Sequence, residues 1–464
     1  MTRAVVGGRA ATRAARAAAT WDGHAARRRT LPDWPVTLLL ALYPLWWALG
    51  LGVLIFPIVA APMVLLLLRC RLAGRPVRLP PGFGWWLVFL TAVVVSIGVL
   101  GVDPPGTVAE HAGTRLVAVV YKLAMYLALT VLLVYTGNLS ATELSRRRLV
   151  RLLGWLFVVT VAGGLLGMVA GRFAFTSPVE WLLPHQIRDK GFVQSLVHPY
   201  AAQIMDLVGA AKPRPAAPWG YTNTWGNNFC LLAGWLVVAA FSAGTRRRTK
   251  LLAALCLLAS VVPAVTSLNR GLWIGLGLLT GYVALRYALM GRLWIFGACT
   301  VAAGALLVAL VASPLGDTVN ARLDNGKSNG VRSFLIERAV DGFESSPVIG
   351  YGGTRNTIGG RNSIAVGERA GCEHCGNFTI GGNGQLWQLL YSHGAVGTIG
   401  YLGFFGYGLW RFRRDRSPIG IAAGAAIATS FSAMLWYNSL VTPLAFMFLA
   451  FALLWRNESE GDNG

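Results

Sequence analysis

Four residues with reactive side chains follow one another in Cys372-Glu373-His374-Cys375. Two thiols, an imidazole and a carboxylate this close together could bind a metal, form a disulfide or take part in catalysis. A structural zinc site usually draws its ligands from two separated pairs, and no second Cys/His pair stands nearby, so we expect no metal. If the segment faces an oxidising compartment, we expect Cys372 and Cys375 to form a disulfide that fixes the direction of His374.

Arginines are the second group of candidate functional residues. Arg270 stands in SLNRGLW, a tight turn between two apolar runs, and Arg214 lies close to Trp219 and Tyr221 just before another run. A guanidinium group matches the oxygens of a phosphate, and aromatic side chains are typical of a membrane interface. These residues predict contact with a lipid-linked phosphate, although Arg270 could instead extend to the interface or cap the preceding helix.

The composition indicates what must position these residues. Of 464 residues, 55% are hydrophobic and only 13% are charged, which is too few to cover a soluble protein, so we predict an integral membrane protein. The net charge of +22 comes from basic residues at the ends of apolar runs. That distribution indicates membrane topology and not a nucleic-acid partner.

The apolar runs predict an all-α, polytopic membrane protein with about twelve transmembrane helices. Basic clusters fall on alternate loops, which puts both termini in the cytoplasm of a bacterial cell and the protein in the inner membrane. The expected spans are about 36–51, 53–68, 85–102, 116–135, 152–171, 226–243, 251–267, 271–288, 293–312, 394–410, 418–436 and 440–455.

Two long external loops separate groups of these spans, and long loops tend to carry function. In each loop one segment has the pattern of a short amphipathic helix lying on the outer surface, at 191–209 and at 331–345. The resulting division is a basic cytoplasmic arm (1–35), five spans (36–171), an external loop (172–225), four spans (226–312), a large external loop (313–393), three spans (394–455) and a cytoplasmic tail (456–464).

The order of four elements between about residues 140 and 412 resembles the O-antigen ligase and polymerase superfamily of bacterial membrane glycosyltransferases. The elements are Arg214 with TNTWGNN before a span, Leu268-Asn269-Arg270-Gly271 before an apolar helix, Arg332 opening an amphipathic helix that ends ESSPVIGYG, and Asn383-Gly384-Gln385-Leu386-Trp387 running to Gly394 and Gly397. The resemblance implies a metal-independent, cofactor-free, inverting transfer from an undecaprenyl-diphosphate-type carrier. The acceptor would be a hydroxyl of a glycan, a lipid or a protein at the outer face of the membrane.

The resemblance also implies roles for individual residues. Arg214 and Arg270 would hold the diphosphate leaving group, where developing charge is stabilised by preorganised guanidinium groups. The remaining substrate-binding residues would be Arg332, Arg338, Tyr221, Asn223, Asn383 and Gln385.

The sequence departs from the family pattern at the general base, because Gly382 occupies the position of the motif histidine. Three explanations are compatible with this difference. His374 replaces the missing imidazole, or another group such as His393 or Glu373 serves as the base, or the protein binds a lipid-linked glycan without transferring it.

The apolar spans also bear on other classes of function. A transporter or flippase for a lipid-linked substrate is the alternative to a glycosyltransferase, and a non-catalytic glycan-binding assembly factor is a third hypothesis. Transporters usually carry charged or broken-helix positions at the membrane midplane, whereas these spans are nearly free of charge, with Lys122 as the clear exception.

Overall fold

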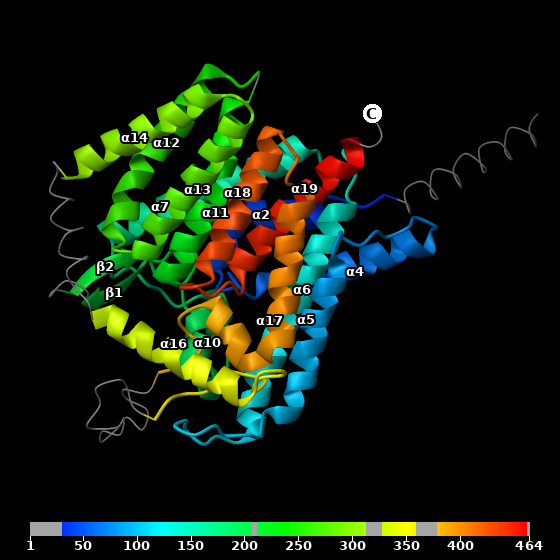
Figure 1. Cartoon of the computed structure of the whole chain (residues 1–464), viewed down its shortest axis with the longest axis vertical. Helices are drawn as coiled ribbons and strands as arrows, with labels where there is room; N and C mark the ends of the chain where they lie inside the picture. The colour runs from blue at the N-terminus through cyan, green and yellow to red at the C-terminus, as the bar shows by residue number, and fades with distance from the viewer. Residues whose placement is uncertain (1–29, 207–210, 243, 312–326, 359–377, 462–464) are drawn as a thin grey trace, which may run out of the picture.

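The computed structural model describes residues 30–206, 211–242, 244–311, 327–358 and 378–461. Helices make up most of the described chain (Figure 1). The N-terminal half contains α2 (Trp34–Ala41), α3 (Tyr43–Ala48), α4 (Ile55–Leu72), α5 (Phe83–Val95), the 3-10 helix η1 (Ser96–Val99), α6 (Ala112–Asn138), α7 (Arg146–Val169), α8 (Pro178–Leu182), α9 (His185–Arg188) and α10 (Gly191–Val197). The C-terminal half contains α11 (Thr222–Phe241), α12 (Arg247–Thr266), α13 (Arg270–Leu289), α14 (Leu293–Val311), α16 (Lys327–Ser345), α17 (Gln385–Arg411), α18 (Pro418–Ala433) and α19 (Thr442–Gly461).

Among the described residues, six helices are long and apolar enough to cross a membrane: α4, α6, α7, α11, α12 and α13. Two shorter apolar segments, 83–99 and 418–433, accompany them. The described chain is therefore that of a helical membrane protein, as its composition predicts.

The structure does not establish all twelve expected spans. The first expected span, 36–51, forms the short helices α2 and α3, of 8 and 6 residues, whereas a spanning helix needs about 20 residues. The break falls at Leu42, just before Tyr43-Pro44, where proline cannot donate the backbone hydrogen bond that a continuous helix requires. The tenth expected span is the second part of α17, which bends at Gly394.

Helix α19 lies at the centre of the bundle and contacts α6, α11 and α18. Its residues from Leu444 to Leu454 are buried on every side, with exposed fractions of 1% or less. A helix that is apolar all round is suited either to lipid or to a protein core, and the contacts of α19 place it in the core. The C-terminal apolar run therefore forms the core on which the rest of the bundle packs.

One element departs from the all-α expectation. Strands β1 (Ala202–Asp206) and β2 (Ala211–Pro215) form an antiparallel hairpin in which Gln203 pairs with Arg214. The helix expected over 191–209 ends at Val197, because the proline at 199 disfavours helical backbone at the residue before it. The prediction of a helix was therefore wrong from His198 to Asp206, and residues 207–209 lie outside the described residues.

The hairpin and its continuation pack against a glycine-rich face of α7. A Cβ atom on Gly163 would lie 2.2 Å from the carbonyl oxygen of Ala217, and one on Gly167 would lie 2.7 Å from that of Ala201. Only glycine permits so close an approach of two backbones. The glycines of α7 therefore determine how closely the segment that carries Arg214 approaches this helix.

The helix expected over 331–345 is present as α16. Figure 1 shows α16, α10 and the hairpin at the same end of the long helices. This end also holds the turn between α12 and α13, since Arg214 of the hairpin bonds to Ser267 of that turn. Segments far apart in the sequence thus meet at one end of the bundle.

Candidate functional site

A cavity of about 480 Å³ lies where these segments meet. Five of the predicted site residues line it: Arg214, Arg270, Arg332, Tyr221 and Asn223. Gly382, the position at which the family resemblance requires a histidine, lines it as well. We call this space the arginine cavity.

Arg214 reaches the cavity from β2 and is buried. Its Nε donates a hydrogen bond of 2.6 Å to the carbonyl oxygen of Ser267, at the end of α12. Its strand partner Gln203 accepts a 2.9 Å hydrogen bond from the backbone N–H of Thr222, at the start of α11. These contacts tie the hairpin to both helices and hold the Arg214 guanidinium in a fixed position.

Arg270 is the first residue of α13, directly after a sharp turn. Leu268 in that turn has a φ of 53°, which is unusual for a residue with a side chain. Asn269 then donates from Nδ2 to the carbonyl oxygen of Thr222 at 3.2 Å and accepts from the hydroxyl of Tyr437 through Oδ1. The left-handed turn and these two bonds direct the start of α13 toward the cavity.

Gly271 allows a third segment to approach Arg270. A Cβ atom at this position would lie 2.5 Å from the Tyr437 hydroxyl oxygen and 2.6 Å from Nε1 of Trp436. No side chain fits at such distances without movement of one partner. In the Arg270-Gly271 pair, the arginine thus supplies the positive charge and the glycine leaves space for Trp436 and Tyr437.

Arg332 enters from α16 and is partly buried. Its pKa is lowered, first by burial and then by the nearby positive charge of Arg270. Two guanidinium groups therefore face the same space, and the described residues that line it include no aspartate or glutamate. Such an arrangement favours a ligand with more than one negative charge.

Two helices also begin at the cavity. Residues 222–224 form the first turn of α11, and Arg270 and Gly271 open α13. The N-terminal end of a helix carries partial positive charge and unpaired backbone N–H groups, which favour phosphate. Their fields add to the charge of the arginines.

The loop between α18 and α19 supplies site residues that we did not predict from the sequence. Trp436, Tyr437 and Asn438 line the cavity, and Asn438 donates from Nδ2 to the carbonyl oxygen of Gly382 at 3.3 Å. Within the described chain, Nε1 of Trp436 and Oδ1 of Asn438 are buried and have no hydrogen-bond partner. Because an unpaired buried polar group is costly, both atoms are suited to bind a ligand.

A signal for this loop was present in the sequence. Trp436-Tyr437-Asn438-Ser439 places polar and aromatic groups between two apolar runs, where we expected only a short turn. Burial raises the pKa of Tyr437, so its phenol stays protonated and donates to Asn269. The loop is therefore part of the wall that positions Arg270.

Asn383 and Gln385 form hydrogen bonds to the segments that make up the cavity wall. Asn383 donates from Nδ2 to the backbone oxygen of Arg332 at 3.4 Å, and Gln385 accepts from the backbone N–H of Ser439 at 3.0 Å. Neither lines the cavity. Arg338 also lies outside it, on α16, where it is exposed and forms a 3.3 Å ion pair with Asp341.

The described lining of the cavity offers no imidazole or carboxylate as a general base. His393 lies elsewhere: it is buried, its Nδ1 is 3.0 Å from the Ser96 hydroxyl, and its ring meets the edge of Phe89. It therefore packs within the bundle and is not placed to deprotonate a ligand in the cavity. Cys372, Glu373, His374 and Cys375 lie outside the described residues.

A second cavity, of about 240 Å³, adjoins the first and shares Tyr221, Thr224 and Leu440 with it. Aromatic side chains dominate its walls: Tyr43, Trp47, Tyr121, Phe192, Tyr200 and Trp219. A polar, cationic cavity thus lies beside one with many aromatic side chains. This pairing suits an amphiphilic ligand with an anionic part and an apolar or sugar part.

A scan against models of known protein families finds no match for this sequence, and a search of curated proteins finds none either. Among the described residues, no cluster of three or more His, Cys, Asp or Glu side chains could hold a metal ion. The chemistry of the two joined cavities is therefore the basis for assigning a function.

Proposed function

We propose that this protein is an O-antigen ligase-like or polymerase-like glycosyltransferase. It transfers a glycan from a polyprenyl-diphosphate carrier to an acceptor hydroxyl at the outer face of the bacterial cytoplasmic membrane. The observation that carries the proposal is the convergence of Arg214, Arg270 and Arg332 on one cavity. Three separate segments supply these arginines, and a diphosphate is the ligand whose charge and size suit them.

The reaction needs charge stabilisation at the leaving group more than anything else. The acceptor oxygen attacks the anomeric carbon, the bond from that carbon to the diphosphate oxygen breaks, and its electron pair stays on the diphosphate. Arg214, Arg270 and the N-terminus of α13 lower the barrier because their fields act on charge that grows in the transition state. No cofactor takes part in this step.

The proton of the acceptor hydroxyl must go to a base. We assign this role to His374, whose imidazole can accept a proton near neutral pH. The assignment rests on the sequence, in which His374 is the histidine nearest to Gly382, and Gly382 itself lines the cavity. A disulfide between Cys372 and Cys375 would restrict the directions in which His374 points.

The adjoining aromatic cavity supports an amphiphilic donor. Tyr121 and Phe192 meet edge to face at 5.3 Å and line this cavity together with Trp219. Such walls stack against sugar rings or pack against isoprenoid units. In the proposed complex the diphosphate lies between the arginines, with the rest of the donor extending past Tyr221.

The test compares arginines inside and outside the cavity. In a strain that lacks the chromosomal gene, Arg270→Ala and Arg214→Ala should each reduce surface or secreted glycan about a hundredfold and raise the level of carrier-linked glycan. Arg338→Ala should behave as wild type, because Arg338 lies outside the cavity and pairs with Asp341. Normal glycan in the Arg270→Ala strain, at normal protein level, would exclude the proposal.

A second function has one specific observation in its favour. Because the described lining includes no base, the protein could bind the lipid-linked glycan as an assembly factor without transferring it. Purified protein mixed with carrier-linked glycan and with membranes of the deletion strain, which supply the acceptor hydroxyls, separates the two functions. Wild type should release free diphosphate carrier and His374→Ala should not, although both bind the donor. Donor binding with no turnover by wild type would favour the assembly factor.

A further inference from the structure

A larger cavity lies at the other end of the bundle. It has a volume of about 1050 Å³ and shares no residue with the arginine cavity. Its walls come from the start of α7, the end of α11 and the start of α12, with Ser417, Pro418, Ile419 and Asn457 closing one side. Because α11 lines the arginine cavity with Asn223 and Thr224 and this one from Leu236 onward, the two cavities lie about 20 Å apart along that helix.

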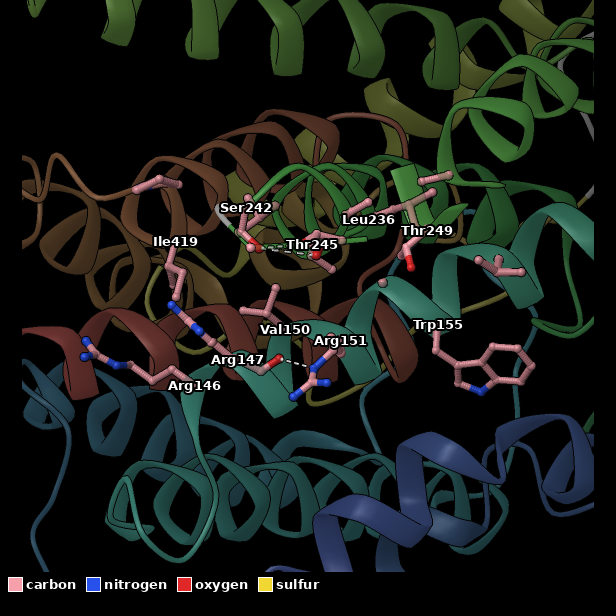
Figure 2. Close-up of a pocket in the computed structure, with 18 of the residues that line it drawn as sticks. Arg146, Arg147, Val150, Arg151, Trp155, Leu236, Ser242, Thr245, Thr249 and Ile419 are labelled. Carbon is pink, nitrogen blue, oxygen red and sulfur yellow. Dashed lines mark hydrogen bonds between the residues drawn. The ribbon is translucent and has the colours of Figure 1, made fainter. Parts of the chain in front are cut away.

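The polar part of this cavity is cationic. Arg147 and Arg151 lie one turn apart on α7, and Ser242 and Thr245, whose hydroxyls hydrogen-bond to each other at 3.2 Å, line the cavity from the loop after α11 (Figure 2). In Figure 2 the Arg147 side chain extends across the cavity toward Ile419 of α18. No described carboxylate lines the space, and no described ion pair involves Arg147 or Arg151.

Helix ends add to this charge. Helices α7 and α12 begin here, at Arg146 and Arg247, whereas the start of α18 is already occupied by the Asp415 carboxylate, which accepts a 2.9 Å hydrogen bond from the backbone N–H of Ser417. The N-terminal dipoles of α7 and α12 point positive partial charge at the same region. Guanidinium groups, hydroxyls and helix N-termini together form a site for a phosphate group.

The deeper part of the cavity is apolar. Trp155 and Val158 of α7, Leu236 of α11, and Leu252 and Cys256 of α12 form its walls. Trp155 and Leu252 are also exposed at the outer surface, at 44% and 66%. Helix α12 is apolar and long enough to span a membrane, and only about a quarter of it is buried, which suits contact with lipid chains.

We propose that this cavity binds one anionic phospholipid. Its phosphate would lie between Arg147 and Arg151, and its acyl chains would lie along Trp155, Leu252 and Cys256. Basic pockets between transmembrane helices recognise anionic headgroups in this way. The basic clusters at this end predict a cytoplasmic location, so the lipid comes from the inner leaflet, whereas the proposed glycan donor lies at the opposite end.

The test measures lipid retained by the full-length protein. After reconstitution in phosphatidylcholine vesicles with a minor fraction of phosphatidylglycerol and extraction in detergent, wild type should retain phosphatidylglycerol over phosphatidylcholine. In the Arg147→Gln/Arg151→Gln variant this preference should fall about tenfold. The matched control Arg246→Gln/Arg248→Gln removes two exposed charges from the same end but outside the cavity, and should retain the preference.

A second measurement locates the acyl chain. Phosphatidylglycerol with a photoreactive group on its acyl chain should label Ala253 and Cys256, which line the cavity, more strongly than Leu255 and Leu258, which lie on the exposed face of α12 outside the cavity. Two results would overturn the proposal: an equal loss of phosphatidylglycerol preference in both double variants, or equal labelling of the two residue pairs. Either result would mean that basic residues attract anionic lipid in general, without a specific site.

Discussion

Replacing Gly271 by alanine tests whether close contact between α13 and the loop after α18 determines the shape of the arginine cavity. The new Cβ would lie 2.5 Å from the Tyr437 hydroxyl oxygen and 2.5 Å from Cδ1 of Trp436. Normal carbon contacts are about 3.5–4.0 Å, so the loop must move by roughly 1 Å. Overpacking of this kind costs about 1–3 kcal/mol in the free energy of unfolding.

The same helix provides a matched control. Gly277 has no atom near the position of an added Cβ. Gly277→Ala should leave stability unchanged or raise it by about 0.5–1 kcal/mol, because alanine is the better helix former. Both substitutions add one methyl group to α13, so their difference isolates the contact with Trp436 and Tyr437.

The assays are denaturant-induced unfolding of purified protein and glycan output in the deletion strain. Gly271→Ala should lower stability and also reduce glycan transfer at normal protein level, because displacement of Tyr437 releases Asn269 and with it Arg270. A change of about 1 Å at a positioning group is enough to slow a reaction about a hundredfold. Equal behaviour of Gly271→Ala and Gly277→Ala would refute the reasoning.

Three further substitutions test other parts of the structure. Tyr437→Phe removes the bond to Asn269 and should lower the free energy of unfolding by about 1 kcal/mol, measured by the same unfolding assay. Glu143 is partly buried, which raises its pKa, but bonds from Arg75 and backbone groups outweigh this and hold the pKa below 4.5. Its stabilising contribution is therefore present above about pH 4.5 and lost as the pH falls through the lowered pKa, so wild-type stability should drop there while Glu143→Gln shows a smaller drop. His393→Gln should reduce stability yet leave glycan output per folded molecule unchanged; a lost output at normal protein level would make His393 the base instead.

Residue patterns predicted the class of protein and several elements well. Apolar runs identified the six long helices, and the spacing around Val331 and Phe334 identified α16. Both signals are local, because a helix satisfies its own backbone hydrogen bonds. The hairpin at 202–215 was missed since a two-stranded hairpin depends on its support, here the glycine face of α7, which the local sequence does not reveal.

The sequence predicted only part of the candidate site, again because local signals do not show how segments pack together. Turn position and residue type pointed to Arg214 and Arg270, and the family resemblance added Arg332 and Arg338, but neither signal separates Arg332 from Arg338 or from Arg355 of the same loop. The structure separates them: Arg332 lines the cavity, Arg338 faces outward, and Arg355 is buried against the carbonyl oxygens of Leu100 and Tyr351. Which arginine meets a ligand depends on helix packing and not on its neighbours in the chain.

By itself the sequence determined a helical membrane protein with cationic turns at the ends of its helices, because hydrophobicity and charge act through local physical chemistry. The tertiary structure alone decided that Arg214, Arg270 and Arg332 share one cavity and that Tyr437 and Asn438 complete its wall. These segments are distant in the chain and meet because glycine faces allow close approach and because the buried helix α19 provides a common core. The sequence of any one segment does not reveal such packing.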